Sequence, residues 1–192
     1  MKRFLLYFAG LVILLSQSSC GYNSMVTKDQ AVKGQWANVQ SAYQRRADLI
    51  PNLVNTVKGA ANFEKSTLTD VIEARAKATS VQVSPENLTP ENIKRFQEAQ
   101  GQISSGLGRL LAVSENYPEL KANANFQELQ AQIEGTENRI NVERNKFNTV
   151  TNDYNGYIRS FPNNLFAGMF GFKEKPYFEA DAASQKAPTV QF

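Results

Sequence analysis

Two charged strings in this chain hold the side chains that could bind a charged ligand or do acid-base chemistry. One reads Arg-Arg-Ala-Asp and the other Gly-Thr-Glu-Asn-Arg, with a further acid after it. Guanidinium groups bind carboxylates and phosphates through paired hydrogen bonds, and carboxylates can transfer protons. The candidates for such a polar cluster are Arg45, Arg46, Asp48, Glu134, Glu137, Asn138, Arg139 and Glu143. In helical bundles, a charged network more often sets register and partner choice.

The residue types that are missing exclude several kinds of site. The sequence has no histidine and one cysteine, Cys20. Imidazole bases, histidine metal ligands, an intramolecular disulfide and a cysteine-cluster zinc site are therefore excluded. The net charge is +3, from 21 basic and 18 acidic residues, and no basic run is interleaved with aromatic residues. We expect no metal, no cofactor and no nucleic acid partner.

The N-terminus has the pattern of an export signal or membrane anchor. Lys2 and Arg3 precede an apolar run over residues 4–15, which is shorter than the roughly 20 residues of a typical spanning helix. Small residues then lead to Cys20. We assign residues 1–19 to a signal peptide or anchor and residues 20–27 to a linker.

Two interpretations of this segment stay open. In a lipoprotein signal, Cys20 would become lipidated, although Gln17 stands where such signals prefer Leu. In an uncleaved signal anchor, residues 4–27, which carry no charge, would stay attached. Both hold the basic N-terminus in the cytoplasm and place the domain on the extracytoplasmic (periplasmic) side of a cell membrane.

Apolar residues repeat every seven positions in three parts of the chain, which is typical of helices that pack along one seam. The series are Trp36, Tyr43, Ile50 and Val57, then Phe96, Ile103 and Leu110, then Phe126, Ile133, Ile140, Phe147 and Tyr154, with Phe161 continuing the last. They predict an all-α fold, an antiparallel bundle of three to four long helices over residues 28–172.

Helix boundaries are predicted from proline, glycine and capping residues. Pro51 and Gly59 predict that the first helix is kinked or broken at each of these points. Residues 81–90 resemble a loop, with Thr89 as the N-cap of the next helix. Pro118 is expected in the first turn of the last long helix.

Two charged residues occupy seam positions where apolar residues are expected. Companion apolar residues follow the same seven-residue period beside these series. Arg46 falls among Val32, Val39 and Leu53, and Glu143 falls between Leu129 and Val150. Because buried charges are costly unless paired, these two side chains are predicted to meet across the bundle. Alternatively, Pro51 shifts the register and leaves Arg46 exposed.

The C-terminal part changes character after residue 162. Residues 163–172 are apolar and aromatic and contain two glycines, and they predict either a short helix folded back on the bundle or an exposed patch for a membrane or partner. Residues 173–192 are interpreted as an extended tail that is disordered beyond Ala182.

Several strings resemble the LemA family of bacterial membrane proteins, in order from about Gly21 to Phe178. They include Gly21–Val26, Gln44–Val54, Thr56–Gly59, Ala74–Ala76, Leu110–Lys121, Glu134–Ile140 and Phe161–Pro162. The resemblance implies a helical bundle tethered at its N-terminus, with most of the protein outside the cytoplasm, and it implies no established enzymatic activity.

The expected function is therefore a non-enzymatic, membrane-anchored scaffold or adaptor of the cell envelope that contacts an unidentified membrane or envelope protein. The alternative is an envelope sensor of a ligand or signal that uses the Arg/Glu cluster. An enzyme would need a carboxylate pair such as Glu134 and Glu137, and a turnover assay on their Gln variants would reveal it.

Overall fold

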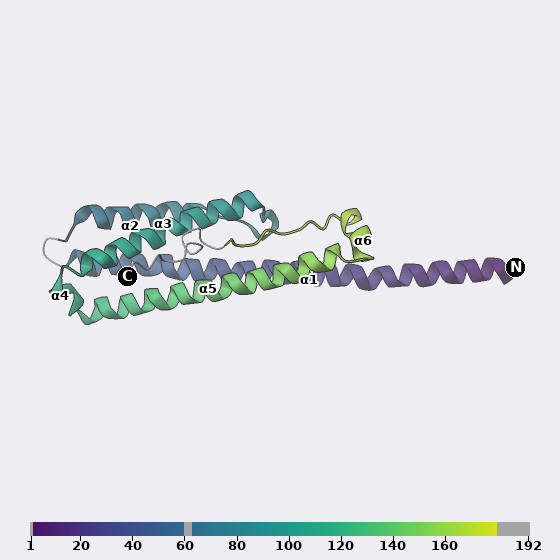
Figure 1. Cartoon of the computed structure of the whole chain (residues 1–192), viewed down its shortest axis with the longest axis horizontal. Coiled ribbons are helices and arrows are strands. Elements are labelled where there is room, and N and C mark those ends of the chain that lie inside the picture. The colour runs from purple at the N-terminus through teal and green to yellow at the C-terminus, as the bar shows by residue number, and fades with distance from the viewer. Residues whose placement is uncertain (1, 60–62, 180–192) are drawn as a thin grey trace, which may run out of the picture.

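The computed structural model describes residues 2–59 and 63–179, with side chains described from residue 21 onward (Figure 1). Within these residues the secondary structure is helical and no strand is present, which confirms the all-α prediction. The elements in chain order are α1 (Lys2–Lys58), α2 (Lys65–Ser80), the 3-10 helix η1 (Pro85–Asn87), α3 (Pro90–Ser114), α4 (Pro118–Lys121), α5 (Ala124–Arg159) and α6 (Asn163–Met169).

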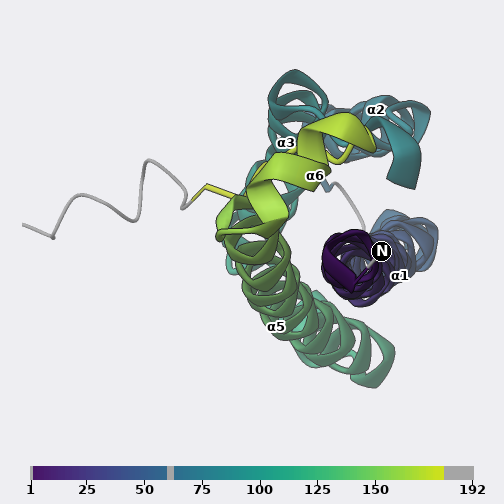
Figure 2. The same ribbon diagram turned by 90° about the vertical axis from the view of Figure 1, so that its right-hand side faces the viewer.

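Four long helices run antiparallel along one axis. α1 packs mainly against α5, and α2 packs mainly against α3. Seen along the axis, α5, α3 and α2 form an arc around α1 (Figure 2). The N-terminal part of α1 continues past the other helices as a single helix (Figure 1). The bundle and the N-terminal segment are therefore joined by one uninterrupted helix.

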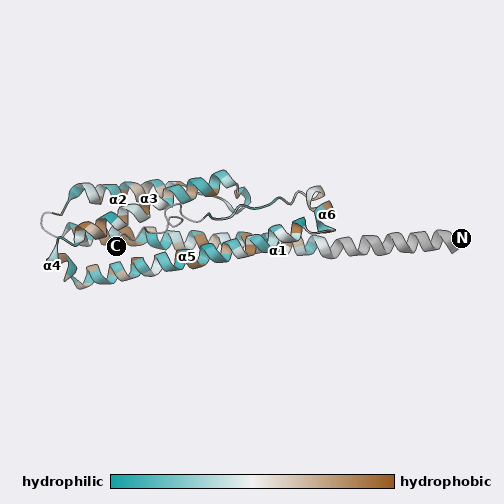
Figure 3. Ribbon diagram, in the orientation of Figure 1, coloured by the Kyte–Doolittle hydropathy of each residue, from teal (hydrophilic) through white to brown (hydrophobic). Residues whose placement is uncertain are grey.

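The core consists of two apolar clusters along the bundle, and the predicted seven-residue series lie in it. The first cluster is aromatic and is centred on Trp36, whose ring lies 5.2 Å from that of Phe96 and 5.6 Å from that of Phe147. The second is mainly aliphatic and includes Ile50, Val71, Ile103, Leu110 and Ile133. Apolar and polar residues alternate along each helix, as expected for helices with one buried face (Figure 3).

α1 ends one residue before Gly59, as predicted, but it is not broken at Pro51. Proline lacks an N–H group, so the carbonyl four residues earlier loses its helical donor. That carbonyl belongs to Ala47, and Arg75 Nε on α2 donates to it at 2.7 Å. Ile50 and Leu53 are fully buried on either side of Pro51. Packing and this hydrogen bond keep the helix continuous.

The other boundaries follow from capping. Thr89 accepts a hydrogen bond from the Asn92 N–H at 3.2 Å, which confirms it as the N-cap of α3. The last long helix does not run unbroken from Pro118, because Asn123 starts a new helix. Its side-chain oxygen accepts from the N–H groups of residues 125 and 126 at 2.9 and 3.2 Å. This local capping competes with continuation of the helix, so α4 and α5 are separate.

α6 folds back against α5 and α1, and it also exposes apolar side chains. Within α6, Ala167 is buried, whereas Leu165 is 62% and Met169 76% exposed. The short helix is confirmed, and it also leaves apolar side chains exposed, whereas their contact with a membrane or partner stays a prediction. A short helix buries one narrow face and leaves the others in solvent.

The segment 173–179 is extended and is bound to the bundle. Asn148 accepts from the Phe178 N–H at 2.8 Å and donates to its carbonyl at 3.0 Å. Asn155 binds the backbone of Lys175 in the same way, at 2.9 Å in both directions. Phe178 is 5% exposed and stacks on Trp36. Residues 180–192 lie outside the described residues.

The described part of the chain holds no helix that is long and apolar enough to cross a membrane. The side chains of the anchor segment, residues 1–19, and of Cys20 lie outside the described residues. The lipidation of Cys20 therefore stays a prediction.

Candidate functional site

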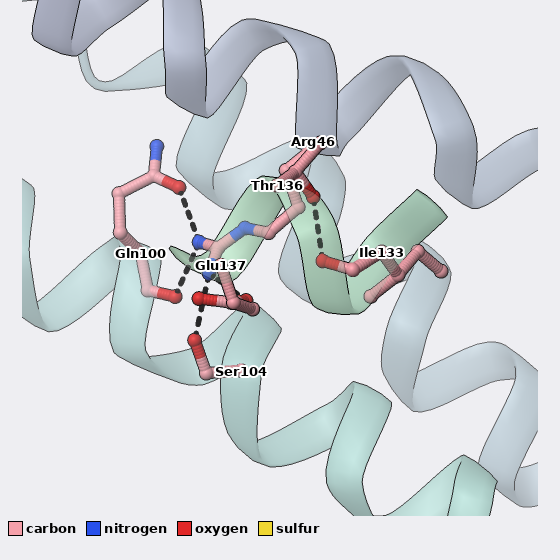
Figure 4. Close-up of polar contacts among 6 residues, drawn as sticks. All are labelled: Arg46, Gln100, Ser104, Ile133, Thr136 and Glu137. Carbon is pink, nitrogen blue, oxygen red and sulfur yellow. Dashed lines mark hydrogen bonds and ion pairs between the residues drawn. The ribbon is translucent and has the colours of Figure 1, made fainter. Parts of the chain in front are cut away.

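The most completely bound charge in the bundle is Arg46 on α1, which is 1% exposed (Figure 4). Its NH1 donates to Ser104 Oγ at 2.7 Å and pairs with Glu137 Oε1. Its NH2 donates to the backbone carbonyl and to the side-chain oxygen of Gln100, at 3.0 and 2.8 Å. One guanidinium group therefore joins α1, α3 and α5.

The surroundings of Arg46 compensate for its loss of water. Its guanidinium lies 5.2 Å from the ring of Tyr43, close enough for a cation–π contact. Within the described side chains, Arg46 Nε and Thr151 Oγ1 are the buried polar atoms that lack a hydrogen-bond partner. Because about four of the five guanidinium N–H groups can be used by the neighbouring acceptors, little binding capacity remains for a ligand.

Glu143 on α5 forms a second buried site and is 2% exposed. Gln35 on α1 donates to its Oε2 at 2.7 Å, and Arg139 Nε and Lys146 Nζ lie 2.9 and 3.4 Å from its Oε1. The hydrogen bond from Gln35 and then the nearby cations hold the pKa of Glu143 below its usual value, against the opposing effect of burial. The carboxylate stays ionised at neutral pH, so it is poorly suited to act as a general base.

The predicted pairing of Arg46 with Glu143 is therefore wrong, although both side chains are buried as expected. Glu143 lies opposite Gln35, and Gln35 precedes Arg46 by eleven residues on α1. That separation is about 16 Å along a helix, too far for an ion pair. Glu137, nearly two turns before Glu143 on α5, takes the place beside Arg46.

The other predicted site residues lie at the surface. Arg45, Asp48, Glu134 and Asn138 are exposed, and Arg139 has a side chain that is 69% exposed. Gln44 donates to Asp48 at 2.8 Å, and Gln130 donates to Glu134 at 3.1 Å. The eight candidates thus divide into the Arg46–Glu137 site, the Glu143–Arg139 site and a set of solvated side chains.

A shallow groove of about 470 Å³ lies between α1 and α5 beside these sites. Its lining includes Arg45 and Arg139 with Asn38, Ser41 and Gln132, so it is basic and polar. Gly135 also lines it, and a side chain at this glycine would meet no neighbouring atom within 4 Å. The groove could hold a small anion. It contains no histidine or cysteine, and no cluster of metal-binding residues was found in the described part of the chain.

Sequence reasoning missed the uncharged partners of both sites. Gln35, Gln100 and Ser104 bind the buried charges, yet their residue types are common on solvated helix faces. Asn148 and Asn155, which bind the C-terminal segment, each follow a residue of the Phe147/Tyr154 series. A polar residue directly beside a buried seam position is the signal that could have indicated them.

The fold and these sites define a class of protein: an elongated antiparallel helical bundle whose buried charges are held by other side chains. The sequence model of the LemA family matches residues 35–192, and the chain belongs to the LemA family.

Three relatives at low identity agree with this assignment. Magnetosome protein MamQ 2 of Paramagnetospirillum magneticum is 26% identical in an alignment of 179 positions that covers 84% of this chain and 66% of that protein. Magnetosome protein MamQ of Magnetospirillum gryphiswaldense is 25% identical, with coverage of 90% and 70%. Protein LemA of Metamycoplasma hominis is 24% identical, with coverage of 92% and 78%. The chain therefore spans slightly less than two thirds of the length of MamQ 2.

Proposed function

We propose that this protein is a non-enzymatic helical scaffold of the cell envelope, tethered to a membrane through its N-terminus. The observation that carries the proposal is the continuity of α1. This helix begins at Lys2, includes the apolar run over residues 4–15 and continues through the bundle core to Lys58. A continuous helix transmits position and orientation from an anchor to a domain better than a flexible linker does.

The state of the charged sites supports a structural role over catalysis. Arg46 is bound by three side chains, and the depressed pKa of Glu143 keeps it ionised. Both sites link helices, which is the usual effect of a buried charge network in a bundle. The names of the MamQ relatives assign those proteins to a cellular structure, the magnetosome, and not to a reaction. This too is consistent with a scaffold.

The tether is tested by the intact mass of the membrane-extracted protein beside a Cys20→Ala variant. A mature chain that starts at Cys20 and carries acyl mass, which the variant loses, would establish a lipoprotein. An unmodified chain that starts at or near Met1 would establish a signal anchor. Recovery of the wild-type chain in the soluble fraction, without acyl mass, would contradict the membrane tether. Protease added to intact cells or spheroplasts tests whether the bundle lies on the extracytoplasmic side.

The scaffold role requires a partner protein, and crosslinking in the membrane tests this. A photocrosslinking residue at an exposed position of α5, such as Val142, should give a discrete product with another envelope protein. The same residue at a buried position, Ile140, serves as the control. Absence of any product from several exposed positions would contradict the scaffold proposal.

The groove between α1 and α5 favours one second candidate, a sensor of small anions. Arg45 and Arg139 line the groove from opposite helices. An anion that bound there would raise the melting temperature, because ligands that bind the folded state stabilise it. A screen of anionic metabolites should then give saturable stabilisation in wild type that is lost in Arg45→Gln. A shift that persists in Arg45→Gln would not come from this groove.

A further inference from the structure

An exposed apolar patch lies at the end of the bundle from which the N-terminal part of α1 emerges. We call it the end patch, and its residues are Tyr22, Phe161, Leu165, Met169 and Phe170. Their exposed fractions are 42%, 80%, 62%, 76% and 49%. Five large apolar side chains exposed together are unusual for a soluble surface and indicate a contact with a partner or a membrane.

Contacts between α1 and the segment that contains α6 define the position of this patch along the axis of α1. The ring of Tyr22 lies 5.0 Å from that of Phe170 and 5.8 Å from that of Phe172, both edge-on. A side chain added at Gly21 would lie 3.3 Å from Asn163 Oδ1 at the start of α6. The patch is thus level with residues 21 and 22. α6 itself lies beside the point where α1 leaves the bundle (Figures 1 and 2).

The distance from this level to the apolar run is short. Tyr22 follows Leu15, the last residue of the run, by seven positions on the same helix. Seven residues of α-helix rise about 10 Å. The headgroup region adds about 5–8 Å on each side of the hydrocarbon core, and a large side chain reaches several ångströms further. If the apolar run is in the membrane, the end patch meets the headgroups.

The charge pattern around the patch fits a lipid surface. Residues 160–172 contain no charged side chain, and neither do residues 4–27 on α1. The uncharged segment is bounded by Lys173 and by Arg159, whose Nε lies 3.6 Å from the carboxylate of Glu174. An aromatic, uncharged segment between basic residues is typical of protein that lies in the headgroup region, where the cations meet anionic lipids.

We infer that the end patch is seated in the lipid headgroup layer and forms a second contact between the bundle and its membrane. The inference rests on the proposed membrane tether and adds the orientation of the bundle. A tether at a single point leaves the tilt and rotation of the domain free, whereas an off-axis contact through α6 fixes both. A seven-residue helix contributes too little area to anchor a protein by itself. The end patch therefore orients the bundle, and the N-terminal segment holds the protein at the membrane.

Quenching by brominated lipid tests this in the full chain. The protein is reconstituted into vesicles of phosphatidylcholine and phosphatidylglycerol, with or without bromine on the upper part of the acyl chains. Met169→Trp places a probe in the end patch, and Ile72→Trp places one at a 44% exposed site on α2 as the control. Both variants keep Trp36, which is buried and adds the same background. Because Met169 and Ile72 are exposed, neither change should disturb the fold, and circular dichroism checks this.

We expect brominated lipid to remove a large part of the additional emission in Met169→Trp and to leave Ile72→Trp unchanged. Equal quenching of the two variants in vesicles that retain the protein on flotation would overturn the inference and leave the tether intact. Failure of the chain to float with vesicles would overturn both. Emission that shifts to the blue with rising protein density, without bromine quenching, would assign the patch to a second copy and would also overturn the lipid contact.

Discussion

The Nε of Arg75 lies 2.7 Å from the carbonyl oxygen of Ala47, the oxygen that Pro51 leaves without a helical donor. α2 thus supplies from outside the hydrogen bond that proline removes from α1. A buried carbonyl without a partner costs roughly 1–3 kcal/mol, so this contact offsets much of the penalty of proline in a helix interior. The same hydrogen bond fixes the axial position of α2 relative to α1.

This relationship predicts coupling between residues 51 and 75. Arg75→Ala should lower the free energy of unfolding by about 1–2 kcal/mol, because the carbonyl loses its donor. In a Pro51→Ala background, the new backbone N–H can donate to the Ala47 carbonyl, so the same change should cost about 1 kcal/mol less. Urea unfolding of the four proteins measures this coupling. Lys77→Ala, an exposed change on the same helix, is the control, and additive costs would contradict the proposed role of Arg75.

Removal of Glu137 and removal of Arg46 should lower the free energy of unfolding by different amounts. Glu137→Ala leaves a buried guanidinium without its counter-charge and should cost about 2–3 kcal/mol, less than for a fully buried pair because the Glu137 side chain is 36% exposed. Arg46→Leu should cost less, because Glu137 can turn to solvent and Leu fills part of the vacated space. Chemical denaturation measures both, beside Glu134→Ala one turn away. A larger loss in Arg46→Leu than in Glu137→Ala would contradict this asymmetry.

Glu143 should make stability depend on acid pH. Its pKa in the folded protein is lowered from 4.5, chiefly by the hydrogen bond from Gln35. The stability that the ionised carboxylate contributes is therefore fully present above pH 4.5. The contribution is lost as pH falls below 4.5 and through the folded pKa, because the unfolded chain binds the proton first. Gln35→Leu should reduce stability at neutral pH and flatten this acid dependence. Unfolding measured from about pH 6 to pH 3 tests it, with exposed Gln30→Leu as the control.

The extended segment should be part of the folding unit. Phe178→Ala removes a 5% exposed ring from the Trp36 cluster and should cost about 3 kcal/mol. It should also change the emission of Trp36, the one tryptophan of the chain, because the stacked ring at 5.9 Å is lost. Glu179→Ala keeps the backbone carbonyl that Gln97 and Arg144 bind, so it should leave both readouts unchanged. Equal effects of the two substitutions would show that Phe178 is not specifically docked.

Much of the fold could be predicted from spacing, because burial in a helix follows a local period. The series from Trp36 is buried throughout, and so is the series from Phe126 as far as Tyr154, and Thr89 caps α3 as its residue type and Pro90 suggested. The prediction that Phe161 continues the second series is wrong, because α5 ends at Arg159 and the Phe161 side chain is 80% exposed. Arg46 and Glu143 are also buried as their seam positions required. The prediction at Pro51 was incomplete, since the donor that replaces its missing N–H comes from residue 75, in another helix.

The sequence by itself determined which residues face the core, where most helices begin and end, and that histidine chemistry and an intramolecular disulfide are excluded. Tertiary structure decided the partners: Arg46 with Glu137, Glu143 with Gln35, and Phe178 with Trp36. The physical reason is that a seven-residue period specifies a face of each helix but not the axial offset between two antiparallel helices. That offset is set by the packing of the whole bundle, and a change of two helical turns moves a charge about 11 Å, from one partner to another.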